Sequence, residues 1–176
     1  MAMISENKAM ITACEKNKIR GERLKYNLDT QGAKRVSLML KDARYLDNFF
    51  SFDKILLDAP CSGSGTINLN NPNTNKIFTQ ELIDRSVKTQ LQLLRKAEMI
   101  LKKGGELVYS TCSILKEENE NIIEKILLKG NFEIIPIDKT MFTDVPFLNT
   151  TIEGTICVMP NELYEGFFAA KLKKIK

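Results

Sequence analysis

Strand-like and helix-like segments alternate along this 176-residue chain, and no other feature constrains its fold as strongly. Segments with helical character lie between most of the apolar runs, and a strand–helix–strand order implies parallel strands joined by crossovers. The last two runs are close enough in sequence to pair as an antiparallel hairpin. We therefore predict an α/β fold with a Rossmann-like sheet that is mostly parallel and has an antiparallel C-terminal edge. The predicted strands lie at residues 10–14, 36–40, 54–57, 106–109, 132–137, 154–159 and 166–172.

The predicted helices have recognisable limits. A basic helix is expected over residues 17–28 and a shorter one over 117–128. The longest helix begins after Thr79, whose hydroxyl suits an N-cap, and should end at the glycine pair 104–105. The asparagine-rich stretch 68–75 before it is predicted to form a loop. The apolar residues of the long helix recur every three or four positions, as a buried helix face requires: Ile83, Val87, Leu91, Leu94, Ala97 and Leu101.

Composition narrows the class of protein. With 43% hydrophobic and 27% charged residues, residues 1–176 are expected to form a single domain around one core. No stretch approaches the roughly 18 apolar residues of a membrane span, and the N-terminus does not resemble a signal peptide. We expect a cytoplasmic protein. The absence of histidine excludes Ser-His-Asp catalysis and His-ligated metal sites. The four cysteines lie far apart, so we expect reduced thiols and no bound metal.

Positive charge is concentrated in two places, although the net charge is only +4. Residues 16–35 contain seven Lys or Arg and two acids, and the last six residues contain four lysines. Such clusters neutralise phosphates in nucleic-acid-binding proteins. A solvated helix face would give the same pattern, so charge alone leaves both interpretations open.

Three acids follow successive predicted strands: Glu15, Asp42 and Asp58. In a doubly wound sheet, an acid after the second strand binds ribose hydroxyls, and ligands gather at the carboxyl ends of the strands. The series indicates a cofactor that contains a nucleoside. An acid at a strand end also caps helices, and the pattern does not distinguish one nucleoside cofactor from another.

Two cysteines lie just beyond predicted strands and should meet at the same edge of the sheet. Cys61 stands in Asp58-Ala-Pro-Cys-Ser-Gly-Ser-Gly65, where Pro60 restricts the backbone and the glycines allow close approach to a flat ligand. Cys112 stands in Tyr109-Ser-Thr-Cys-Ser113, between hydroxyl side chains that favour a polar, thiolate-friendly pocket. Buried cysteines that only fill space are the alternative.

These two motifs, followed by Glu118-Asn119-Glu120 and an ending Glu165-Gly-Phe-Phe-Ala-Ala-Lys-Leu172, resemble the Nop/Sun family of RNA cytosine-5 methyltransferases. The similarity spans nearly the whole chain. It implies a class I methyltransferase fold, S-adenosyl-L-methionine as cofactor, and RNA, either rRNA or tRNA, as substrate and partner. Methylation of rRNA is the favoured expectation.

The resemblance also implies catalytic roles. The match makes Cys112 the nucleophile that adds to carbon 6 of cytosine, after which carbon 5 attacks the methyl group. Cys61 would assist release of the methylated product, and Asp58 would hydrogen-bond the base near nitrogen 3. In DNA cytosine-5 methyltransferases the Pro-Cys cysteine attacks instead, so a reversed order of the two thiols is the rival within this chemistry.

The same match implies the cofactor-binding residues. Glu15 should hold the ribose and Asp42 the adenine, while Arg20 supports the site and Asp58 lies close to the cofactor. Surface ion pairs are the alternative interpretation of these charged residues.

Two departures from the family pattern bear on activity. The glycine-rich cofactor loop, an Asp-x-Cys-Ala-Ala-Pro-Gly-Gly-Lys-Thr type sequence on the first strand, is absent. We therefore expect either an N-terminally truncated domain that lacks its first, central strand, or a sheet that closes differently. A missing N-terminal segment or a homo-oligomer could complete the site. Residues 67–77 carry asparagines where the family commonly has arginines, which weakens inference about the RNA.

Two other classes of function remain open. A catalytically silent Rossmann-like remnant could bind RNA or protein through the basic helix. A thiol-redox role is the third alternative, although the chain has no Cys-x-x-Cys arrangement.

Overall fold

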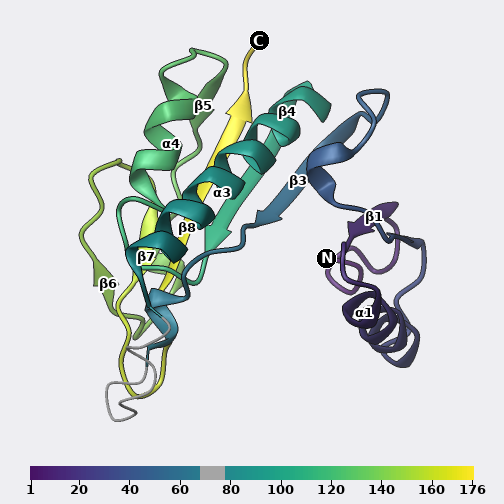
Figure 1. The fold of residues 1–176 in the computed structure, drawn as a ribbon, viewed down its shortest axis with the longest axis horizontal. Coiled ribbons are helices and arrows are strands. Elements are labelled where there is room, and N and C mark those ends of the chain that lie inside the picture. The colour runs from purple at the N-terminus through teal and green to yellow at the C-terminus, as the bar shows by residue number, and fades with distance from the viewer. Residues whose placement is uncertain (68–77) are drawn as a thin grey trace. The chain divides into compact units, whose positions relative to one another are not determined.

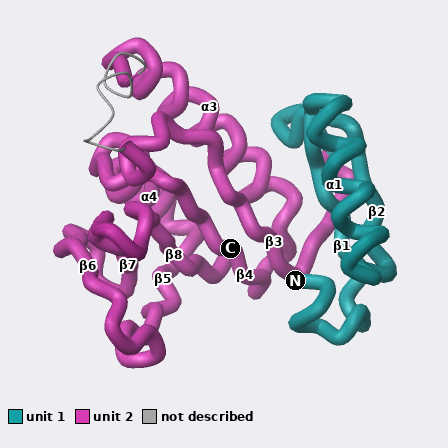
Figure 2. Tube along the Cα trace, turned by 90° about the horizontal axis from the view of Figure 1, so that it is seen from below, with its two compact units in different colours: residues 1–47 teal, residues 48–176 magenta. Residues whose placement is uncertain are grey.

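The computed structural model describes residues 1–67 and 78–176, in two compact units that comprise residues 1–47 and 48–176 (Figure 2). The predicted asparagine-rich loop at 68–75 lies outside the described residues. Whether the chain forms a single domain stays a prediction.

Unit 1 contains one helix and one pair of parallel strands. Strand β1 (Ile11–Cys14) pairs with β2 (Val36–Met39), and helix α1 (Lys18–Thr30) connects them. The Asn17 side chain caps α1 by accepting a hydrogen bond from the Arg20 N–H. These elements match the predicted strands and basic helix to within two residues. A short 3-10 turn, η1 (Ala43–Tyr45), follows β2.

Unit 2 is built on a six-stranded sheet with the order β3-β4-β8-β7-β6, in which β5 also pairs with β8 (Figure 1). Strands β3 and β4 are parallel, and every other described pair in this sheet is antiparallel. The predicted hairpin of the last two strands is confirmed as the pair β7–β8. The strands are β3 (Phe52–Asp58), β4 (Leu101–Thr111), β5 (Phe132–Ile134), β6 (Phe147–Leu148), β7 (Ile156–Val158) and β8 (Phe167–Lys174).

Among the described residues, strands β1, β2 and β3 each have one ladder partner. Strand β1 pairs with β2 alone and β3 with β4 alone, so one edge of each strand makes no ladder hydrogen bonds within the described chain. The predicted α/β class is confirmed, with parallel pairs β1–β2 and β3–β4 and antiparallel pairing wherever β5, β6, β7 or β8 takes part.

Helix α3 (Gln80–Ile100) lies along one face of the unit 2 sheet and leads directly into β4 (Figure 1). The predicted N-cap is confirmed, since the Thr79 hydroxyl accepts a hydrogen bond from the Leu82 N–H. The predicted end at the glycine pair 104–105 is wrong. Leu101 is already extended and pairs with Phe52, and the glycines lie in an irregularity of β4 where the register shifts. Pairing with β3 therefore ends the helix at Ile100.

Helix α4 (Glu120–Leu127) is shorter than the predicted 117–128 because residues 116–119 form turns instead of a first helical turn.

The core of unit 2 lies between the sheet and the helices α3 and α4. No helix in the described part of the chain is long and apolar enough to cross a membrane. The fully buried apolar side chains of this core include Leu107, Tyr109, Ile122, Ile123, Phe168 and Leu172.

Candidate active site

The two cysteine loops meet at the carboxyl ends of β3 and β4, as the sequence predicts. Asp58 and Ser110 are partners in the parallel register, so the residues after them leave the sheet side by side. Cys61 Sγ lies 2.9 Å from Cys112 Sγ, and both side chains are partly exposed. Two thiols in contact at a strand-end edge form a site where a ligand can reach either sulfur.

Backbone hydrogen bonds tie the two loops together on both sides of the thiols. The Ala59 N–H donates to the Ser110 carbonyl at 2.8 Å, and the Gly65 N–H donates to the Cys112 carbonyl at 3.0 Å. The hydroxyls of Ser64 and Ser113 are 2.8 Å apart and buried. The separation of the sulfurs is therefore set by main-chain contacts as well as by side-chain packing.

Two glycines in close contact, Gly65 and Gly166, support the Cys61 loop. The Gly166 N–H donates to the Gly65 carbonyl at 2.8 Å. A Cβ built on Gly65 would lie only 2.2 Å from the Gly166 carbonyl oxygen, and one built on Gly166 would lie 2.4 Å from Ile114 Cγ2. Side chains do not fit at either position, which explains the need for glycine here.

A buried carboxylate holds the Cys61 loop. Glu118 is fully buried and accepts two hydrogen bonds from Ser62, at 2.7 Å from its N–H and 2.6 Å from its hydroxyl. The side-chain amide of Gln90, also fully buried, donates to the Pro60 carbonyl at 3.0 Å. The Tyr109 hydroxyl donates to the Glu118 carbonyl at 2.6 Å. These contacts connect the loop to α3 and β4.

The next residue in sequence holds the Cys112 loop. Asn119, fully buried, donates to the Ser113 carbonyl at 2.8 Å and accepts a hydrogen bond from the Thr111 hydroxyl. Both neighbours of Cys112 are thus bonded to one side chain.

The surroundings of Cys61, Cys14 and Cys157 raise the pKa of their thiols. Burial, the contact with Cys112 and the nearby Glu118 charge raise the pKa of the Cys61 thiol well above its ordinary value. Burial alone raises the pKa of the Cys14 thiol, and burial with the Glu120 charge raises the pKa of Cys157 to about 11. The Cys61 thiol is therefore harder to ionise than an ordinary cysteine.

Asp58 is exposed at the end of β3, and one of its carboxylate oxygens accepts a hydrogen bond from the Ser110 hydroxyl at 2.9 Å. Its second oxygen has no hydrogen-bond partner in the described residues. The carboxylate thus lies on the same strand end as Cys61, with acceptor capacity for a ligand.

In unit 1, Glu15 and Asp42 follow the paired strands β1 and β2. Arg20 makes a bidentate ion pair with Glu15, at 2.9 and 3.0 Å, and its hydrogen bonds lower the pKa of that carboxyl. Arg44 pairs with Asp42 at 2.6 Å and lowers the pKa of Asp42 in the same way. Arg20 therefore lies beside Glu15, and its predicted role at a cofactor site stays a prediction. Both carboxylates are partly exposed, and each oxygen of Asp42 already accepts two hydrogen bonds from Arg44.

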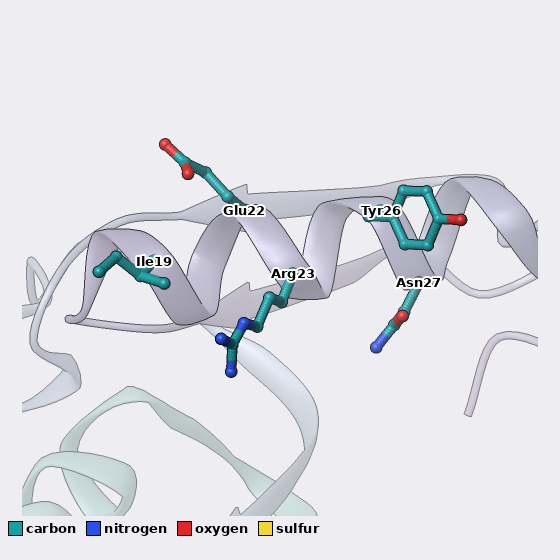
Figure 3. A pocket seen from close by; sticks show the side chains of 5 residues that line it. All are labelled: Ile19, Glu22, Arg23, Tyr26 and Asn27. Carbon is teal, nitrogen blue, oxygen red and sulfur yellow. The ribbon is translucent and has the colours of Figure 1, made fainter.

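Helix α1 carries an open hollow on its exposed face, lined by five of its own side chains (Figure 3). Because all five belong to one helix and are exposed, the hollow is a helix surface and not an enclosed binding cavity. Residues 1–67 and 78–176 contain no cluster of Cys, Asp and Glu able to hold a metal ion. The five residues are Ile19, Glu22, Arg23, Tyr26 and Asn27.

Sequence reasoning did not identify the supporting residues Ser62, Gln90 and Glu118. Gln90 interrupts the apolar face of α3, and a buried polar residue on such a face is the signal that could have located it. Glu118 stands in the Glu118-Asn119-Glu120 motif of the family resemblance, but that motif assigned no role to its side chain.

The sequence matches the family described as 16S rRNA methyltransferase RsmB/F over residues 1–173. Ribosomal RNA small subunit methyltransferase F of Shewanella piezotolerans is 35% identical, over 99% of this chain and 37% of that protein. The tRNA (cytosine(72)-C(5))-methyltransferase of Pyrococcus horikoshii is 34% identical, over 100% of this chain and 43% of that protein. The chain thus spans less than half the length of these relatives.

Solved structures agree with this match. NSun6 from Pyrococcus horikoshii, determined with SFG, has a TM-score of 0.84 at 32% identity, over 99% of this chain and 44% of that one. A methyltransferase homolog from the same organism has a TM-score of 0.81 at 32% identity, over 99% of this chain and 56% of that one. The chain therefore belongs to the RsmB/F methyltransferase family, which confirms the resemblance to Nop/Sun proteins.

Proposed function

We propose that this chain contains the site that transfers a methyl group from S-adenosyl-L-methionine to carbon 5 of cytosine in RNA. The observation that carries the proposal is the 2.9 Å contact between Cys61 Sγ and Cys112 Sγ beyond two parallel strands. Carbon 5 of cytosine is a poor nucleophile, so the reaction needs a thiolate that adds to carbon 6 first. A second thiol beside the first suits the later removal of the product.

In this mechanism Cys112 is the nucleophile. Its thiolate forms a bond to carbon 6, and the displaced electron pair makes carbon 5 nucleophilic. The bound cofactor supplies an electrophilic methyl group, which carbon 5 takes up. A base then removes the proton from carbon 5, the bond from carbon 6 to Cys112 breaks, and the thiolate is restored.

Cys61 is assigned to the release step. The Thr-Cys-Ser motif around Cys112 is the signature of the RNA branch of this chemistry, which argues against Cys61 as the attacking thiolate and so against the order used by DNA methyltransferases. From its position against Cys112, it is placed to act on the bond that must break. Asp58 is the last residue of β3, and it would hydrogen-bond the base near nitrogen 3.

Four residues are proposed to bind the cofactor. Glu15 would bind the ribose, Asp42 the adenine, and Asp58 would lie close to the cofactor, with Arg20 orienting Glu15 through their ion pair. The chemistry of these residues fits, because partly exposed carboxylates accept hydrogen bonds from hydroxyl and amine groups.

RNA is the proposed partner, and rRNA or tRNA the proposed class, because the relatives are named for a ribosomal RNA and a tRNA activity. The seven Lys and Arg residues between positions 16 and 35 are all exposed, and they support binding to a phosphate backbone. A cytoplasmic location is the matching proposal. The competing role, a silent module that binds RNA or protein, predicts RNA binding without affinity for the cofactor.

The test is covalent capture on RNA in which the target cytosines carry fluorine at carbon 5. After methyl transfer the fluorine cannot be removed as a proton is, so the enzyme stays bonded to the RNA. We expect a cofactor-dependent protein–RNA adduct, with the RNA mapped to the peptide containing Cys112. An adduct on Cys61 would reverse the assigned order. Absence of an adduct, together with no heat of binding for S-adenosylmethionine, would favour the silent module.

A further inference from the structure

Two neighbouring residues, Glu118 and Asn119, each hold one of the two thiol loops. The carboxylate of Glu118 binds Ser62, which directly follows Cys61. The side chain of Asn119 binds the residues on both sides of Cys112. One short segment before α4 thus sets the positions of both sulfurs.

The use of a carboxylate at position 118 is costly for the fold. Glu118 is fully buried, and a buried charge is tolerated only where hydrogen bonds compensate for its lost hydration. Ser62 supplies two such bonds, and the Gln90 amide approaches the same carboxylate at 3.5 Å. A neutral side chain would fill this space at lower cost, so packing alone does not explain the acid.

Gln90 shows that the network is directed at the Cys61 loop. Its amide nitrogen donates to the Pro60 carbonyl, while its Oε1 atom is buried without a hydrogen-bond partner among the described residues. The opposite amide orientation would point an oxygen at the Pro60 carbonyl and at Glu118. In its observed orientation, the Gln90 amide leaves its oxygen without a hydrogen bond while its nitrogen keeps the bond to the Pro60 carbonyl.

We propose that Glu118 is a positioning residue, which holds the Cys61 thiol against the Cys112 thiol by fixing Ser62, and which thereby sets the rate of the release step. The consequence for release rests on the proposed function. The positioning itself does not, and it is measurable in the protein without RNA or cofactor.

The first experiment measures how fast the 176-residue chain forms the Cys61–Cys112 disulfide under a limiting thiol oxidant, by mass spectrometry of the peptides. Sulfurs 2.9 Å apart need to move by less than an ångström to bond. Glu118→Ala should slow this reaction by about tenfold or more, because small misplacements of reacting groups cost large factors in rate. Glu118→Gln should stay within about threefold, because its amide still pairs with the Ser62 N–H and hydroxyl.

Two controls separate positioning from general loss of structure. Glu117→Ala removes the exposed neighbouring acid and should leave the rate unchanged. Phe132→Leu loosens the core away from the thiols and should lower the melting temperature without slowing disulfide formation. If Glu118→Ala does not fold, Ser62→Ala, which loses one of the two bonds to the carboxylate, should slow the reaction by about threefold. An undiminished rate in Glu118→Ala, or in Ser62→Ala where that variant replaces it, overturns the proposal.

A second experiment connects positioning to release. With ordinary RNA and S-adenosylmethionine, Glu118→Ala should form the Cys112 adduct at a rate within about threefold of the original protein but accumulate it, as a release defect requires. Parallel slowing of adduct formation and release would contradict a specific role in release. If the unaltered chain forms no adduct while the disulfide rates differ as expected, the positioning stands and the proposed function fails.

Discussion

The two units of this chain hold their candidate functional residues in different ways. In unit 2 the thiol loops rest on buried side chains, including Glu118 and Asn119, and on a core with several fully buried residues. In unit 1 the only buried residues are Gly21 and Leu46, and Glu15 and Asp42 are held by ion pairs at the surface. Exposed ion pairs contribute little stability, whereas buried networks specify geometry. The thiol site is thus preorganised, and the carboxylates proposed to bind the cofactor are only locally oriented.

The largest expected effects are a loss of methyl transfer in the unit 2 site and a weaker loss of cofactor binding in unit 1. Cys112→Ser should reduce methyl transfer by at least about 10³-fold, because the covalent route is lost. Glu15→Gln should weaken cofactor binding by about tenfold, since one hydrogen-bonding partner changes and the others remain. Single-turnover transfer assays and calorimetric titration with S-adenosylmethionine measure the two effects. Near-normal transfer by Cys112→Ser would remove the assigned nucleophile.

The second prediction compares equal truncations in the two units. Leu172→Ala removes a fully buried side chain from unit 2 and should lower the free energy of unfolding by about 3 kcal/mol. Leu38→Ala acts on a partly exposed strand of unit 1 and should cost about 1 kcal/mol. Urea denaturation of both variants measures the difference. Equal losses would show that unit 1 buries its strands as fully as unit 2.

Glycine substitutions test how tightly the thiol loop is packed. Gly65→Ala forces a Cβ to within 2.2 Å of the Gly166 carbonyl oxygen, so the backbone must shift, at a cost of about 2 kcal/mol. In Gly104→Ala the new Cβ meets no neighbouring atom. Only the positive φ of 78° is unfavourable for alanine, and it should lower the free energy of unfolding by about 1 kcal/mol. Gly65→Ala should also slow disulfide formation between the two thiols, whereas Gly104→Ala should not. Identical behaviour of the two variants would argue against a rigid loop.

The meeting of Cys61 and Cys112 was predictable because both follow strands whose parallel pairing was also predictable. The end of α3 was not, because Leu101 continues the helical spacing of apolar residues while its backbone pairs with Phe52. Sequence periodicity contains no information about that partner. The two-residue strand β6 gave no periodic signal at all. Glu118 and Glu120 are buried while Glu117 is exposed, and a local pattern does not report this difference.

The smallest expected effect concerns the ion pair of unit 1 and its dependence on pH. Hydrogen bonds from Arg44 lower the pKa of Asp42 in the folded protein, so this carboxylate stabilises the fold at pH values above its unfolded pKa, near 4. That contribution is lost as the pH falls through the lower, folded pKa. Because the pair lies at the surface and is partly exposed, we expect only about 0.5 kcal/mol. Asp42→Asn should therefore lower the stability slightly at pH 7, and the difference from the original protein should shrink as the pH falls below 4, in parallel urea titrations. A loss above about 2 kcal/mol at pH 7 would contradict the contrast between the units, because it would mean that unit 1 also depends on a strongly coupled charge.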